Sequence, residues 1–163
     1  MLAVFEQGGT WARGTQVAPG AQLSGVSCTS AGNCEGAGGD GARGNSQNLI
    51  VAAATEGGWG QGTPVMAPLG GPSANAAGIS CASPGDCVAV GWYWAPSLAI
   101  YPFAVMETGG TWSQATPIAA PFGAHTAQLT SVSCTSPGTC EAVGSFGDGV
   151  DSSGLLAVTT APS

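Results

Sequence analysis

The sequence has little charge, and very little of it is positive. Of 163 residues only 7% are charged, Arg13 and Arg43 are the only arginines, lysine is absent, and the formal net charge is −7. Phosphate groups are bound by clustered lysine and arginine side chains, so we expect no nucleic-acid partner. The most apolar segment, residues 95–106, is interrupted by two prolines. It is shorter than the roughly 20 residues that span a bilayer, so we expect no membrane insertion.

Helix-forming runs are missing as well. Glycine accounts for 28 residues and proline for 11, and both disfavour helix. Intrinsic disorder is equally disfavoured, because 44% of the residues are hydrophobic and five are tryptophan. The composition therefore predicts an all-β protein, with one domain over residues 1–163.

A repeat of 53 residues organises the chain. The six cysteines form three pairs of equal internal spacing, and equivalent cysteines of successive pairs are 53 residues apart. The pairs are Cys28 and Cys34, Cys81 and Cys87, and Cys134 and Cys140. A Gly-Gly turn that ends in tryptophan also recurs three times, at Trp11, Trp59 and Trp112. We divide the chain into a partial repeat 1–22, repeats 23–76 and 77–128, and a partial repeat 129–163.

The cysteine pairs predict three local disulfides. Zinc sites use tighter cysteine pairs with histidine partners, and the chain has a single histidine. Structural disulfides indicate an oxidising compartment, so we expect a secreted or cell-surface protein. Met1 is followed directly by the strand-like sequence Leu2-Ala3-Val4-Phe5, so we expect no signal peptide in this chain.

Each repeat reads as four short strands separated by Gly, Pro and Ser turns. Short strands with a period near 50 residues are typical of a β-propeller blade, and a β-sandwich is the main alternative. Three four-stranded blades do not close a ring, whereas two copies of the chain supply six blades. We therefore expect a homodimer that forms a six-bladed propeller. The alternative is that the chain is a piece of a longer propeller.

The residues of the third repeat also resemble a known group of proteins. The stretch Ser-Val-Ser-Cys-Thr-Ser-Pro-Gly-Thr-Cys-Glu-Ala-Val-Gly-Ser-Phe, residues 131–146, resembles the propeller-like repeats of secreted actinobacterial proteins. The Gly-Gly-Thr-Trp turn distantly resembles the tail of the Asp-box in sialidase-type blades. Both resemblances imply propeller blades and leave the activity open.

Propeller topology gathers the variable loops at one end of the blades, where we expect function. The candidate ligand-binding residues in these loops are Asp40, Arg43, Trp92, Tyr93 and Trp94. Adjacent aromatic residues suit sugar rings, because side chains alternate along a strand and at least one ring must be exposed. The alternative for these aromatic residues is local packing or a dimer contact. Trp11, Trp59 and Trp112 recur in every repeat, which favours packing between blades over carbohydrate stacking.

His125 is the candidate catalytic residue, since its ordinary pKa lies near neutrality. With Asp148 or Asp151 it would form an acid–base pair or bind a divalent metal at the propeller axis. The alternative is a solvated loop histidine.

The sequence thus predicts a secreted propeller that binds glycans through its variable loops and has no cofactor. Its expected partners are a second copy of itself and a small molecule or glycan. The alternatives are a small hydrolase with its active site at the axis, metal-assisted through His125, and a purely structural surface protein.

Overall fold

The computed structural model shows an all-β chain. It describes residues 2–4, 6–16, 21–41, 48–68, 71, 73–148 and 153–159, and within these ranges every regular element is a β-strand. The described residues contain no helix that could cross a membrane.

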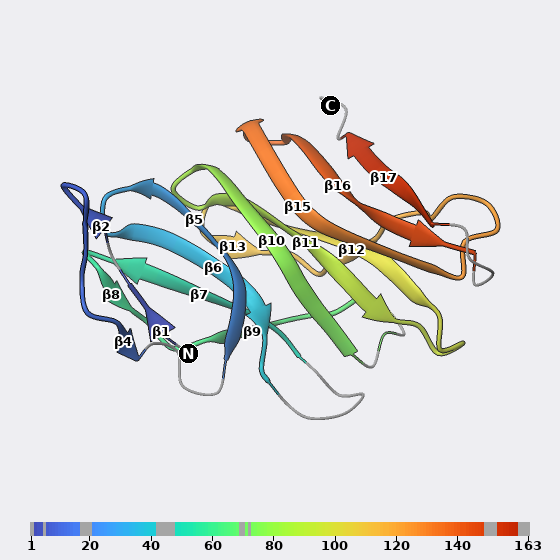
Figure 1. Cartoon of the computed structure of the whole chain (residues 1–163), viewed down its shortest axis with the longest axis horizontal. Coiled ribbons are helices and arrows are strands. Elements are labelled where there is room, and N and C mark those ends of the chain that lie inside the picture. The colour runs from blue at the N-terminus through green and yellow to red at the C-terminus, as the bar shows by residue number, and fades with distance from the viewer. Residues whose placement is uncertain are drawn as a thin grey trace.

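Three antiparallel meanders follow one another along the chain (Figure 1). The first meander consists of β5 (Gln22–Ser30), β6 (Asn33–Gly39), β7 (Leu49–Thr55) and β9 (Thr63–Val65), with β8 (Gly58–Trp59) as a short extension. The second consists of β10 (Ser73–Ser83), β11 (Asp86–Trp94), β12 (Ile100–Thr108) and β14 (Thr116–Pro117), with β13 (Thr111–Trp112) as the extension. The third consists of β15 (Thr126–Ser136), β16 (Thr139–Gly147) and β17 (Ser153–Thr159).

The N-terminal segment repeats the end of a meander. Here β1 (Leu2–Ala3) pairs with β4 (Thr15–Gln16), and β2 (Glu6–Gln7) pairs with β3 (Thr10–Trp11). The same arrangement joins β12 to β13 and β14 around the Gly-Gly turn of the second meander. The repeat seen in the sequence is therefore also a repeat of strand pairing.

The first two strands of each meander share a β-bulge with a glycine opposite it. In the second meander the bulge lies between Ala76 and Gly78. A side chain on Gly91 would collide with the carbonyl oxygen of Asn75, so this position requires glycine. Gly38 and Gly144 occupy the equivalent positions and face the carbonyl oxygens of Gln22 and Gln128. The bulge therefore recurs at the equivalent position of β5, β10 and β15, the strands that carry the first cysteine of each pair.

All three predicted disulfides are present. They link Cys28 to Cys34, Cys81 to Cys87 and Cys134 to Cys140, and the described residues contain no free cysteine. Each closes the tight turn between the first two strands. In the first two meanders this turn also contacts the Gly-Gly turn, because Gly57 N–H donates to the oxygen of Gly32 at 2.9 Å and Gly110 N–H donates to that of Gly85 at 3.0 Å. The disulfide turns and the Gly-Gly turns therefore lie at one end of the strands.

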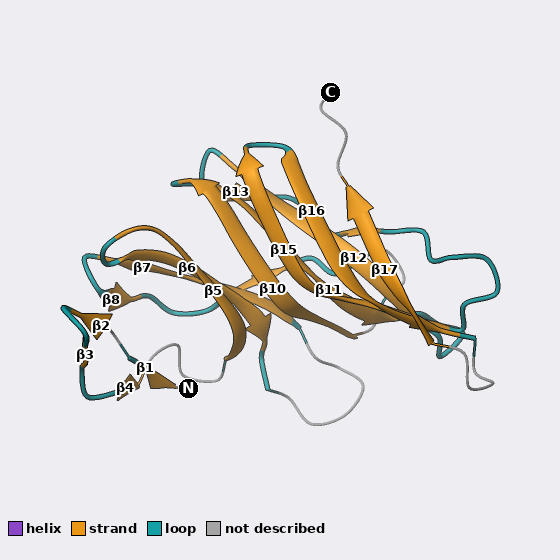
Figure 2. Cartoon of the chain, turned by 45° about the horizontal axis from the view of Figure 1, so that its top comes forward, coloured by secondary structure: helices purple, strands orange, loops and turns teal. Residues whose placement is uncertain are grey.

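The meanders pack against each other through their sheet faces. One core lies between the first and second meanders and includes Ala37, Leu49, Ile79, Phe103 and Val105. A second core lies between the second and third meanders and includes Val88, Val90, Leu129 and Ala142. Figure 2 shows the three meanders lying in sequence, with β5, β10 and β15 in neighbouring positions. A single parallel bridge, Ile100 to Thr126, joins the second meander to the third.

Candidate functional site

The loops at the end opposite the disulfides form the first candidate site. The loop after β11 ends at Ile100, and the loop before β15 ends at Thr126, so the Ile100–Thr126 bridge holds the two loops together. His125 N–H donates to the oxygen of Gly147 at 2.9 Å, which places His125 next to the loop that contains Asp148. We call this region the loop-end surface and define it by Trp92, Trp94, Leu98, Phe122 and His125.

Two tryptophans of β11 lie edge to face at this end. The rings of Trp92 and Trp94 are 6.4 Å apart with an interplanar angle of 86°, and both side chains are half-buried. Tyr93 between them points to the other face of the sheet, where it is buried and packs 6.2 Å from Tyr101. The aromatic run therefore divides as strand alternation requires, with one ring in the core and two at the surface.

Two further apolar side chains in the flanking loops are exposed to solvent. Leu98 is 72% exposed and has φ of 64°, a left-handed conformation that is uncommon for a leucine. Phe122 is fully exposed in the loop before β15. A cavity of about 340 Å³ opens beside these loops, lined by residues that include Ile100, Gln128 and Phe146. Its size falls within the range of small-ligand sites.

The other predicted loop residues are only partly brought together. Asp40 accepts a hydrogen bond from the Asn48 side chain at 2.7 Å, and Asp148 is half-buried next to Gly147. Arg43 and Asp151 lie outside the described residues, so their proposed roles stay predictions. Among the residues described, no group of three or more His, Cys, Asp or Glu side chains could hold a metal ion.

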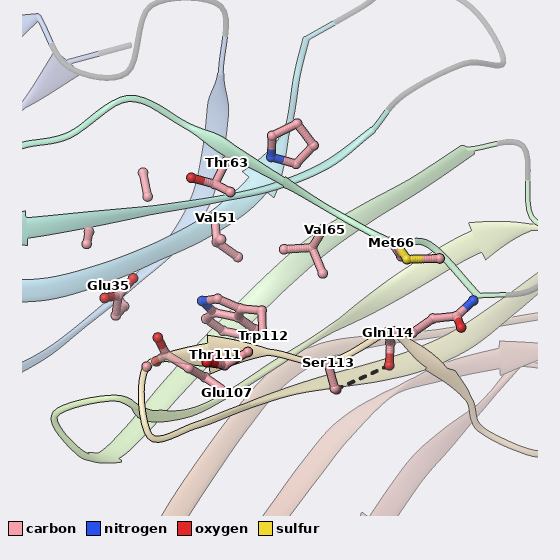
Figure 3. Close-up of a pocket in the computed structure, with 14 residues that line it drawn as sticks. Glu35, Val51, Thr63, Val65, Met66, Glu107, Thr111, Trp112, Ser113 and Gln114 are labelled. Carbon is pink, nitrogen blue, oxygen red and sulfur yellow. Dashed lines mark hydrogen bonds between the residues drawn. The ribbon is translucent and has the colours of Figure 1, made fainter.

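A second candidate site lies between the first and second meanders, at the opposite end. It is a cavity of about 400 Å³ whose ionisable lining residues are Glu35 of β6 and Glu107 of β12. Figure 3 shows both carboxylates at the end of the cavity where Trp112 lies. Glu107 is the cross-strand neighbour of Trp112. The other polar lining residues are Thr63, Thr111, Ser113 and Gln114. We call this the inter-sheet cavity.

Glu107 has an unusual environment for a carboxylate. Its side chain is 7% exposed, and Oε2 has no hydrogen-bond partner among the described residues. Burial, and secondarily the charge of Asp86, raises the pKa of Glu107. Burial, and secondarily the charge of Glu107, raises the pKa of Glu35 from 4.5 to about 7. Two carboxylates thus face one cavity, and none of the described residues that line it is basic.

Neither glutamate was predicted from the sequence. Glu35 occupies the repeat position of Val88, which packs in the core between the second and third meanders. Glu107 lies on the same face of β12 as the core residues Phe103 and Val105. The one available signal was the placement of acidic residues at core-facing strand positions in a chain with only nine acidic residues.

The repeated tryptophans occupy three different environments. Trp112 is half-buried against the core between the first two meanders, and Trp59 packs beside Ile50 and Ala52 on the outer face of the first. Trp11 is 67% exposed. Packing between sheets therefore describes Trp112 and does not describe Trp11.

Comparisons with known proteins give no family assignment. No protein-family model matches the chain, and no curated protein sequence matches it.

Proposed function

We propose that the chain is an exported glycan-binding protein and that the loop-end surface is its binding site. The observation that carries this proposal is the half-buried, edge-to-face pair of Trp92 and Trp94. Trp94 is the cross-strand neighbour of Ile100, which lines the cavity of about 340 Å³. Aromatic faces stack on the apolar faces of sugar rings, and nearby amide and hydroxyl groups such as those of Gln128 and Thr126 hydrogen-bond to sugar hydroxyls. The three disulfides fit an oxidising compartment outside the cytosol.

The proposal includes the ring expected from the repeat. The three meanders serve as propeller blades, and a second copy of the chain completes six blades. Support comes from equivalent positions on successive blades. Val90 and Ala37 are 1% and 0% exposed where the next meander covers them, whereas Val143 of the third meander is 51% exposed. Leu49 is 0% exposed, but its equivalent Leu155 is 92% exposed.

The occupant of this exposed face is a second copy, because the opposite end of the stack offers the matching surface. Ile79 is 8% exposed where the second meander meets the first, and its equivalent Val26 on the first meander is 59% exposed. Within one chain, the same interface forms twice, between the first and second meanders and between the second and third. The third meander of one copy and the first meander of the other carry the two halves of a further interface of this kind. Two such contacts, related by a two-fold axis, close the ring.

An array of immobilised oligosaccharides tests the glycan-binding proposal. We expect saturable binding to a subset of the array, and calorimetry with the best soluble ligand should give at least a ten-fold weaker affinity for Trp94→Ala. Trp11→Ala is the matched control, since Trp11 is exposed and lies outside the loop-end surface. Absence of saturable binding, or equal loss in the two variants, contradicts the proposal. Cleavage of the ligand, lost in His125→Ala, would instead favour the hydrolase.

A further inference from the structure

We propose that the inter-sheet cavity binds the positively charged amine of a ligand, with Glu35 and Glu107 as its counter-ions and Trp112 as the aromatic wall. This site is distinct from the loop-end surface and does not depend on glycan binding there. The proposal rests on the position of the two carboxylates, on the unpartnered oxygen of Glu107 and on the composition of the lining.

The unpartnered oxygen points to a hydrogen-bond donor that the described residues do not supply. A buried carboxylate oxygen without a partner costs free energy comparable to a lost charged hydrogen bond. Glu107 Oε2 is in this state, and its side chain is more than nine-tenths buried at the wall of the cavity. An ammonium group has three N–H donors and no acceptor, so it satisfies oxygens of two carboxylates at once.

The charge of the cavity also favours a cation. Among the described residues, Glu35 and Glu107 are the ionisable side chains that line it, and Asp86 adds negative charge beside Glu107. Asp86 itself receives hydrogen bonds from Ser83 and from Gly109 N–H, so its carboxylate is held by the turn. In the part of the chain that the structure describes, the basic side chains are Arg13 and His125, and neither lines this cavity. A bound cation therefore compensates charge that the protein leaves unbalanced.

The remaining lining fits an organic cation better than a bare metal ion. Trp112 presents an indole ring, and Val51, Val65 and Met66 supply apolar surface. Cations are attracted to indole faces, and the attraction grows when the site excludes water. With two carboxylates, the cavity also falls short of the three-ligand groups that hold metal ions, none of which occurs among the residues described.

Titration of the protein with cyclohexylammonium, followed by ¹⁵N–¹H spectra, tests the proposal. Cyclohexanol is the neutral probe of the same shape. We expect the amine to shift resonances of cavity residues, the Trp112 indole N–H among them, and the alcohol to bind at least ten-fold more weakly. Equal binding of amine and alcohol would overturn the proposal.

The pH dependence of the amine affinity distinguishes a binding role of Glu35 from a purely structural one. With the pKa of Glu35 at about 7, its ionised fraction falls from about nine-tenths at pH 8 to about 3% at pH 5.5. An alkylammonium stays protonated across this range, so we expect about ten-fold weaker binding at pH 5.5. An affinity that does not change with pH contradicts the assignment of Glu35.

Two isosteric variants separate binding from folding. Glu35→Gln and Glu107→Gln should each weaken binding of the amine at pH 8 by at least five-fold. Both should melt no lower than the parent, because each removes a buried charge. Glu56→Gln removes the same charge from an exposed turn outside the cavity and should leave binding unchanged. Unchanged binding in both cavity variants would overturn the proposal.

Discussion

The side-chain oxygen of Ser27 accepts a hydrogen bond of 3.0 Å from the backbone N–H of Cys81, across the boundary between the first and second meanders. Ser80 and Cys134 repeat this contact at 3.0 Å between the second and third meanders. The register of the disulfide-linked pair explains why the backbone N–H of Cys81 is free to bond to the serine. Cys81 and Cys87 face each other with a Cα–Cα distance of 4.0 Å, which is the close spacing of a pair that exchanges no backbone hydrogen bonds. The serine thus satisfies a donor at the edge of the next sheet.

Loss of this serine should destabilise the stack. We expect Ser80→Ala to lower the free energy of unfolding by about 1–2 kcal/mol, because the Cys134 N–H then loses its acceptor at a partly buried site. Urea unfolding at pH 7 measures the change. Ser97→Ala, in an exposed turn, should change it by less than about 0.5 kcal/mol. Equal effects of the two substitutions would show that the inter-sheet bond contributes nothing.

The equivalent tryptophans Trp112 and Trp11 should differ in their contribution to stability. Trp112 packs against the core between two meanders, so Trp112→Ala should cost about 2–3 kcal/mol, less than a fully buried tryptophan. Trp11 is 67% exposed, so Trp11→Ala should cost less than about 1 kcal/mol. Thermal unfolding followed by circular dichroism compares them. The account is wrong on this point if Trp11→Ala is the more damaging.

Stability should fall as the pH rises from 4.5 to about 7. The pKa of Glu35 is about 7 in the folded chain and 4.5 is its ordinary value, so the folded state holds this proton more tightly than the unfolded state does. The free energy of unfolding contributed by Glu35 therefore decreases between pH 4.5 and about pH 7 and is constant above that. Glu107 acts in the same direction. Denaturant unfolding at pH 5, 6, 7 and 8 measures this dependence.

Glu35→Gln provides the control for this pH dependence. The glutamine cannot ionise, so the stability of the variant relative to the parent should increase from pH 5 to pH 8. A difference between the two proteins that stays constant with pH would mean that Glu35 has an ordinary pKa in the folded chain.

The sequence was informative wherever the repeat determines local geometry. The equal spacing of Cys28 and Cys34, and of the two later pairs, predicted the disulfides because a turn of this length lets cysteines face each other. Alternation along residues 92–94 required Tyr93 to lie opposite its two neighbours.

The sequence was uninformative where contacts cross from one repeat to another. Nothing in the spacing indicates that Glu35 of one meander and Glu107 of the next line the same cavity, because that depends on which sheet faces meet. Likewise the serine–cysteine contacts follow from the stacking of two sheets, which the periodicity of a single strand does not reveal.

The molar mass in solution tests most directly the central claim that one repeated interface builds the stack and that a second copy completes it. Light scattering at micromolar concentration should give twice the chain mass of 15.7 kDa, and Leu155→Asp should return the mass to that of a single chain. Leu98→Asp alters an equally apolar exposed residue at the loop end and should remain a dimer. A parent protein with the mass of one chain, or a Leu155→Asp variant that stays dimeric, would contradict the claim.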